Sequence, residues 1–163
     1  MKTIVDERPR QAPRPDVAAF EQVTRALVGI TLESLDALGG AVSVPQFRLL
    51  LTLDGLGRVP SSTLASALGM VASSVTRLVD RLQSAGLVVR GADEHSRSIV
   101  TVEVTGAGRD LVSSVLERRH ALIEAVLDAM DPAARQAAAE AATRFAQLAG
   151  DAVTLGASGP VPV

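Results

Sequence analysis

The side chains best suited to chemistry cluster in one segment of this sequence, between positions 71 and 84. Hydroxyl groups and arginines are closely spaced there, at Ser73, Ser74, Thr76, Arg77 and Arg81. Hydroxyl and guanidinium groups form hydrogen bonds with base edges and phosphate oxygens, so this segment could contact a nucleic acid. A polar outer face is also typical of any soluble helix, and both interpretations stay open on this segment alone.

The sequence offers little for catalysis. Its two histidines are His95, near Asp93 in a polar segment, and His120, which has Glu117 and Glu124 at helical spacing. Neither histidine belongs to a recognisable pair of nucleophile and base, so we expect that the chain is not an enzyme and has no cofactor. Three ligands of common type at helical spacing are a weak signal, and a metal-responsive protein is kept only as an alternative.

Hydrophobic spacing places the polar side chains on a helix that closely follows another. The apolar residues that recur at 3.6-residue spacing and form one stripe are Val71, Val75, Leu78, Val79 and Leu82. This stripe leaves Thr76 and Arg77 on the opposite face. A short helix beginning at Ser61 or Ser62 precedes it and ends at Gly69, where the missing Cβ permits a left-handed turn. Two short helices joined so tightly predict a helix-turn-helix.

A β-hairpin is predicted directly after these helices. Gly86 ends the second helix, and LVVR and SIVTVEVT are rich in β-branched residues on either side of the polar segment GADEHSR. This pattern favours two strands joined by a polar tip. A hairpin in this position is the wing of a winged helix-turn-helix.

Longer helices are predicted on both sides of this unit. An amphipathic helix runs from Asp16 to Gly39-Gly40, and another begins at Thr105 and reaches Met130. The last helix begins at Asp131-Pro132, a cap followed by a first-turn proline, and ends at Gly150.

One further helix precedes the short pair. Ser43 caps it, Pro45 lies in its first turn, and Gly55–Gly57 end it. Its predicted buried side consists of Phe47, Leu50, Leu51 and Leu53.

Composition predicts one globular domain and a cytoplasmic location. The 163 residues are 47% hydrophobic, enough to bury a core. No apolar run approaches the roughly 20 residues of a membrane-spanning helix, and the N-terminal segment lacks the apolar core of a signal peptide. We therefore expect no contact with a membrane. The absence of cysteine fits a reducing compartment, as in the cytoplasm.

Charge is distributed unevenly along the chain. Residues 43–109 and the arm 1–15 each carry a net charge of +2, whereas 16–42 and 110–163 each carry −3. A positive centre between acidic flanks suits a phosphate-bearing partner, but an imbalance this small supports one only weakly.

A series of residues at fixed intervals covers the chain from about 45 to 110. It comprises Leu64-Ala65, VTRLVDRL at 75–82, Gly86-Leu87-Val88, Arg90, Asp93, Arg97, Val100 and the ending Thr105…Gly108. With the order of predicted elements, this series resembles the MarR (multiple antibiotic resistance regulator) family. The resemblance implies a mainly α fold with a small β-hairpin wing, a winged helix-turn-helix with long helical dimerisation elements from both termini.

The resemblance also divides the chain into parts. These are a flexible N-terminal arm (1–15), an N-terminal dimerisation helix (16–42), the winged helix-turn-helix (43–106), C-terminal dimerisation helices (107–150) and a flexible tail (151–163).

By the same resemblance, the chain is a transcriptional regulator, a repressor that binds a palindromic operator in double-stranded DNA as a homodimer. Its recognition helices would enter successive major grooves. The residues that would contact DNA are Ser61, Ser62, Ser73, Ser74, Thr76, Arg77, Arg81, Arg90 and Arg97. Among these, Ser61, Ser62 and Arg90 would approach phosphates, and Arg97 would reach the minor groove from the wing tip.

Members of this family often bind small, frequently aromatic acids between the dimer helices and the winged domain. A small-molecule effector is therefore expected to relieve DNA binding. Arg48 is the basic group that the sequence places near such a crevice.

Two positions depart from the family pattern, and a second alternative function stays open beside the metal-responsive one. Ser96-Arg97-Ser98 stands where the family commonly has Asp-Arg-Arg, so Arg97 lacks the usual orienting aspartate. Val71 stands where a capping Ser or Asp often begins the recognition helix, which predicts an uncapped first turn. Winged helices also serve as protein-interaction modules without DNA, because fold does not decide function.

Overall fold

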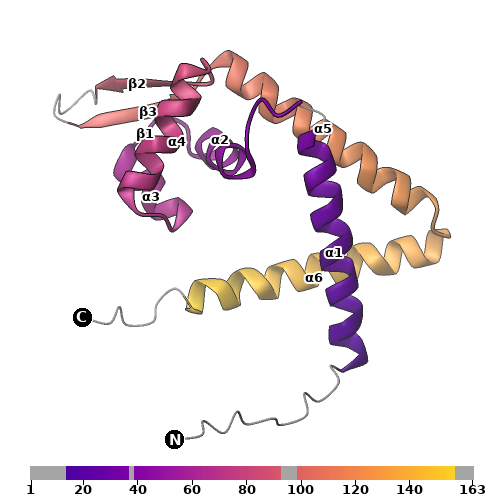
Figure 1. The fold of residues 1–163 in the computed structure, drawn as a ribbon. Helices are drawn as coiled ribbons and strands as arrows, with labels where there is room; N and C mark the ends of the chain where they lie inside the picture. Colours follow the sequence, from indigo (N-terminus) through magenta and orange to yellow (C-terminus); the bar gives the residue numbers. More distant parts are fainter. Residues whose placement is uncertain (1–13, 37–38, 93–98, 157–163) are drawn as a thin grey trace, which may run out of the picture. The chain divides into compact units, whose positions relative to one another are not determined.

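The computed structural model describes residues 14–36, 39–92 and 99–156 of the chain, and within them six helices and a three-stranded antiparallel sheet (Figure 1). The helices are α1 (Pro15–Asp36), α2 (Val44–Leu56), α3 (Ser61–Leu68), α4 (Ala72–Ser84), α5 (Gly106–Asp128) and α6 (Pro132–Gly156). The strands are β1 (Val59–Pro60), β2 (Val88–Ala92) and β3 (Val100–Val104). The predicted mainly α fold with a small hairpin is confirmed.

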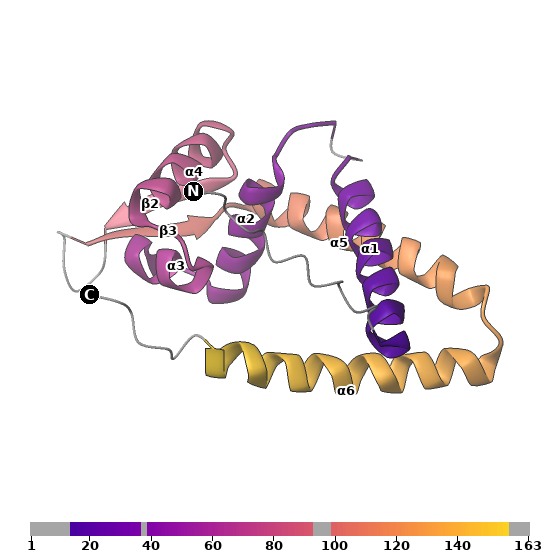
Figure 2. The same cartoon turned by 60° about the horizontal axis from the view of Figure 1, so that its bottom comes forward.

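The chain forms two compact units, Met1–Arg119 and His120–Val163. The first contains the helix-turn-helix, the sheet and a core to which α2, α3, α4 and the sheet contribute. Its fully buried side chains include Leu49, Leu50, Leu53, Leu64, Leu82, Val75, Val79, Val102, Val112 and Val115. Figure 2 shows α3 and α4 beside the sheet and α2, in agreement with the contacts between these elements.

Helix α2 begins as the sequence predicts, but its buried side differs by one residue. Ser43 is the N-cap, and its amide donates to Gln46 Oε1 at 2.7 Å. Leu51 is exposed, contrary to prediction, and Leu49 is fully buried instead. Because α2 contacts α3, α4 and β3, its buried arc is decided by three neighbours and not by one helical stripe.

The sheet contains a strand that the sequence analysis did not predict. β1 pairs antiparallel with β3, with Val59 opposite Val102, and β3 lies between β1 and β2. Only two residues form β1, too few for a recognisable alternation. This strand joins the start of α3 to the base of the predicted wing.

The turn between α3 and α4 has the predicted left-handed residue. Gly69 adopts φ 62° and ψ 34°, and its amide donates to the Ser66 carbonyl oxygen at 3.1 Å. Val71, assigned from the sequence to the buried stripe of α4, is 68% exposed. It is the N-cap and precedes the first turn, so its extended backbone (φ −68°, ψ 143°) takes it off the helical stripe.

The start of α5 is attached to the end of α4 by close backbone contacts. Thr105 Oγ1 donates to the Gly86 carbonyl oxygen at 2.7 Å, and the Thr105 amide donates to that of Leu87 at 3.0 Å. The Gly108 amide donates to Thr105 Oγ1 at 3.1 Å. A Cβ at position 108 would overlap the Leu87 carbonyl oxygen, so the ending Thr105…Gly108 is a packing requirement at this junction.

The last helix begins as predicted and ends later. Asp131 Oδ1 accepts from the Ala134 amide at 2.9 Å, which is a side-chain N-cap. The prediction that Gly150 ends the helix is wrong, because α6 continues to Gly156. A single glycine costs a helix only about 1 kcal/mol relative to alanine, and helix-forming residues surround this one.

One carboxyl group near the start of α1 has a shifted pKa. Asp16, in the first turn of α1, has its pKa lowered by the side chain of Arg14 and then by the Val17 amide.

Within the described residues, no single helix has the length and apolar character needed to cross a membrane. Helices α3 and α4 meet that test only as a pair bent by 110°.

Candidate nucleic-acid interface

Helix α4 presents the two faces that the sequence predicts. Val75, Val79 and Leu82 are buried in the core, which fixes the rotation of the helix about its axis. Ser73, Thr76, Arg77 and Arg81 are exposed on the remaining surface, and Ser74 is half-buried. A well-packed inner face therefore supports an outer row of hydroxyl and guanidinium groups.

The polar groups of α4 differ in how far they are engaged. Thr76 Oγ1 donates to the Ala72 carbonyl oxygen at 3.0 Å, which leaves its lone pairs able to accept. Arg77 has no hydrogen-bond or ion-pair partner in the described ranges, so its guanidinium group is available to a ligand.

Neither helix of the helix-turn-helix has a side-chain cap at its N-terminus. Val71 is the N-cap of α4 and Pro60 that of α3, and neither position supplies a side-chain acceptor. The predicted uncapped start of α4 is therefore confirmed. Ser61, half-buried, and Ser62, exposed, form the first turn of α3, as the predicted phosphate contacts require.

Arg90, predicted to contact phosphate, is engaged within the chain. Its Nη2 lies 2.6 Å from Asp80 Oδ1, and its Nη1 donates to Gln83 Oε1 at 2.7 Å. Nη2 also donates to the Thr76 carbonyl oxygen at 3.5 Å. Arg90 therefore links β2 to three residues of α4, and its contact with phosphate stays a prediction.

The wing is described only at its base. β2 and β3 pair from Val88–Val104 to Ala92–Val100. Arg97, Ser96, Asp93 and His95 belong to segment 93–98, which lies outside the described residues, so the minor-groove role of Arg97 stays a prediction.

A second arginine holds this base, and the sequence analysis missed it. Arg58 Nε donates to Thr101 Oγ1 at 3.0 Å, and its Nη2 donates to the Ala92 carbonyl oxygen at 2.8 Å. The one signal available was Gly91, since an isolated glycine in a strand often marks the close approach of another group.

The predicted effector residue Arg48 also has an internal partner. Its Nη2 donates to the Leu68 carbonyl oxygen at 3.1 Å, at the C-terminus of α3. Arg119 offers a different cationic group. Its guanidinium carbon Cζ lies 5.8 Å from the ring centroid of Phe47, and its Nε is buried without a hydrogen-bond partner among the described residues.

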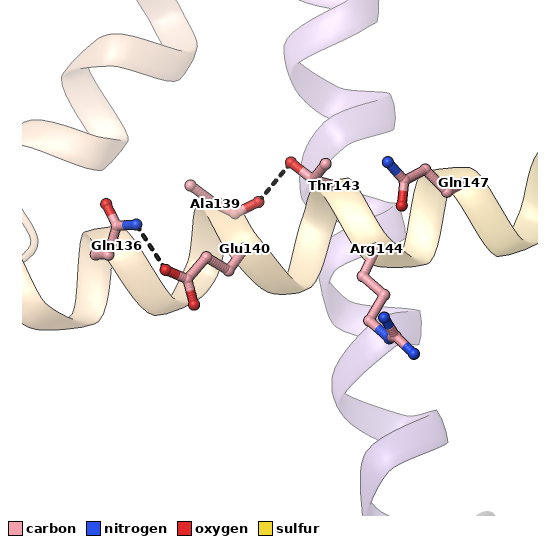
Figure 3. Close-up of a pocket in the computed structure, with 6 residues that line it drawn as sticks. All are labelled: Gln136, Ala139, Glu140, Thr143, Arg144 and Gln147. Carbon is pink, nitrogen blue, oxygen red and sulfur yellow. Dashed lines mark hydrogen bonds between the residues drawn. The ribbon is translucent and has the colours of Figure 1, made fainter.

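Surface hollows lie along α6 and beside Arg58 and Gly91 at the base of the wing. A hollow of about 460 Å³ is lined by Gln136, Ala139, Glu140, Thr143, Arg144 and Gln147, all from α6 (Figure 3). Gln136 Nε2 there donates to Glu140 Oε1 at 2.6 Å. In the described part of the chain, no group of three His, Asp or Glu could hold a metal ion, and Glu117, His120 and Glu124 form no such site.

The comparisons with known proteins agree with this geometry. A model described as the MarR family matches residues 42–98. The chain is 30% identical over 99 residues to the uncharacterised HTH-type transcriptional regulator YfiV of Bacillus subtilis. This alignment covers 61% of the chain and 62% of the relative, so the chain spans less than two thirds of that relative's length.

Solved structures extend the likeness to nearly full length. The crystal structure of RV1404 from Mycobacterium tuberculosis is 33% identical, with 86% of this chain and 97% of that chain covered and a TM-score of 0.78. Streptococcus pneumoniae FabT, solved in complex with DNA, is 18% identical, with 81% and 98% covered and a TM-score of 0.64, a likeness of fold. By sequence match, element order and winged helix-turn-helix geometry, the chain belongs to the MarR family of transcriptional regulators, which are not enzymes.

Proposed function

We propose that this protein represses transcription by binding a palindromic operator in double-stranded DNA as a homodimer, with α4 in the major groove. The exposed polar face of α4 carries this proposal. Arg77 and Ser73 are exposed on a helix whose inner face is locked in the core. The N-terminal residues of such a helix meet base edges when it lies in the major groove.

The first turn of α3 and the wing would supply the remaining contacts. Ser61 and Ser62 stand where a helix N-terminus favours a phosphate, and Arg81 lies in the last turn of α4. Arg97 would enter the minor groove. FabT, a protein of the same fold, was solved with DNA, which supports the choice of partner.

Homodimerisation is supported by the apolar surface of α1. Only Ser34 and Leu35 of its 22 residues are buried. Val17, Val23, Leu27, Val28 and Leu32 are between 46% and 51% exposed, a patch of the kind that marks an interface. A second copy of the chain is the proposed partner, because a two-fold dimer matches the symmetry of a palindromic operator.

A selection from a random duplex library tests the proposal. The full-length protein should enrich a palindromic sequence with half-sites about one helical turn apart, and should bind it in gel shifts as a dimer. A folded protein that enriches no duplex would favour the alternative of a protein-interaction module, since protein docking does not require half-site spacing.

We also propose that a small acid relieves this binding, with Arg119 in place of the sequence-predicted Arg48 as its cationic partner. Arg119 Nε lacks an acceptor among the described residues and lies beside the buried Phe47, whereas Arg48 donates to Leu68. A panel of aromatic and aliphatic carboxylates should include one that raises the melting temperature of the parent and not of Arg119→Gln. A panel without effect on either protein or on operator binding would contradict the proposal.

A further inference from the structure

The side chain of Arg58 extends across the open end of the three-stranded sheet. Arg58 directly precedes β1, whose Pro60 pairs with Thr101 of β3. From there its guanidinium group bonds Thr101 Oγ1 at 3.0 Å on β3 and the Ala92 carbonyl oxygen at 2.8 Å on β2. One side chain therefore connects all three strands where the wing leaves the body of the domain.

The groups around Arg58 are arranged to receive it. A Cβ at position 91 would lie 2.5 Å from Arg58 Nη2, so only glycine leaves the guanidinium in this position. Thr101 is buried, and its hydroxyl accepts from Arg58 Nε while donating to the Gly91 carbonyl oxygen at 3.1 Å. The absence of a side chain at Gly91 leaves room for the planar guanidinium group of Arg58, and the buried hydroxyl of Thr101 bonds it. Lysine does not reproduce this geometry.

Arg58 joins two surfaces that the proposed function places on DNA. β1 leads directly into the first turn of α3, with Ser61 and Ser62, and β2 and β3 lead to the wing. The hydrogen bond from Arg58, next to β1, to the Ala92 carbonyl oxygen on β2 fixes the direction of the wing relative to α3. We propose that Arg58, held by Gly91 and Thr101, is a positioning residue that orients the wing for DNA binding. This inference rests on the proposed function.

Direct contact of Arg58 with phosphate is the competing role. Two of its nitrogens are already bonded within the chain, which favours the positioning role. The two roles predict different salt dependence. Loss of a phosphate contact lowers the log–log salt slope by about 0.9, whereas loss of orientation weakens binding at an unchanged slope.

Three variants and one control separate these roles. Arg58→Ala removes the side chain, Gly91→Ala displaces it while keeping its charge, and Thr101→Val removes one acceptor with little change of shape. Gly55→Ala is the matched control, because Gly55 lies in α2 with open space around the added methyl. Circular dichroism and thermal melting identify any variant that fails to fold. Thr101→Val, the mildest change, then takes the place of that variant in the measurements of exchange and binding.

Amide hydrogen exchange tests the link itself and needs no DNA. The amides of Gly91, Ala92 and Thr101 should exchange about tenfold faster in Arg58→Ala and Gly91→Ala than in the parent and in Gly55→Ala, the change expected when about 1.4 kcal/mol of local stability is lost. Unchanged exchange in both variants would overturn the inference, whatever the outcome for DNA.

Fluorescence anisotropy with the duplex selected by the parent tests the consequence. Arg58→Ala and Gly91→Ala should each bind about tenfold more weakly at the parental salt slope, and the double variant no more weakly than either, because both remove one link. Parental affinity in both variants would overturn the inference. So would a lower slope in Arg58→Ala with parental binding in Gly91→Ala, which identifies a phosphate contact. Failure of the parent to select any duplex overturns the proposed function, and with it the role of Arg58 in DNA binding, while the exchange data still decide whether the link exists.

Discussion

Arg90 on β2 forms an ion pair with Asp80 on α4, with 2.6 Å between Nη2 and Oδ1. The arginine side chain is 28% exposed and the aspartate side chain 56%. Because Arg90 also bonds Gln83, it fixes β2 against the recognition helix α4, whereas Arg58 bonds Thr101 on β3 and Ala92 on β2. Arginines thus connect the base of the wing to α4, through Arg90, and to the start of β1, through Arg58.

Arg90→Ala should lower the free energy of unfolding by about 0.5–1 kcal/mol, the range for a partly exposed ion pair. Asp80→Asn should cost a similar amount, and the double variant less than the two single losses together, because both remove one interaction. Urea unfolding of the four proteins measures this coupling. Strictly additive losses would mean that the pair contributes no stability.

Arg77→Ala should reduce discrimination between the selected operator and a scrambled duplex by about 1–3 kcal/mol, since a guanidinium group bonded to a guanine edge contributes that much. Anisotropy titrations on both duplexes measure the difference. Arg25→Ala, an exposed arginine of α1, is the charge-matched control and should keep the parental ratio. An equal loss of affinity on both duplexes would assign Arg77 to phosphate instead of a base.

Leu27→Asp should convert the proposed dimer to monomer and abolish specific binding, because it places a charge in the exposed apolar patch of α1. Gln22→Asp is the control, because it adds the same charge on the other side of the same helix. At about 100° of rotation per residue, Gln22 faces away from Leu27. Sedimentation velocity distinguishes the two. A Leu27→Asp protein that remained a dimer would place the interface elsewhere.

Gly108→Ala should destabilise the fold by about 1–3 kcal/mol, the usual cost of overpacking, because its Cβ would overlap the Leu87 carbonyl oxygen and the Val104 side chain. Gly106→Ala, two residues earlier with open space around the new methyl, should be neutral or slightly stabilising. Thermal and urea unfolding compare them. Equal stability of the two variants would show that the junction of α4 and α5 can adjust.

The sequence alone was sufficient for the positions of the helices and for several of their ends, although not for the C-terminus of α6. The stripe of α4, the left-handed Gly69 and the caps Ser43 and Asp131 depend on residues no more than a few positions apart. Such local signals do not need a tertiary partner. The series of residues at fixed intervals from 45 to 110 carried the resemblance to the MarR family, although some of its positions serve contacts across the fold, such as Gly108 against Leu87.

Tertiary structure decided what local pattern leaves open. β1 exists because β3 pairs with it, and Leu49 is buried in place of Leu51 because α2 has several neighbours. The partner of Arg48 lies 20 positions away along the chain. The partners of Arg58 lie 43 and 34 positions away, and those of Arg90 lie 7 to 14 positions away. A long arginine side chain has many rotamers, and only the packed positions of its acceptors select one of them. The sequence therefore named Arg48 and Arg90 without revealing which groups they bind, and it did not name Arg58.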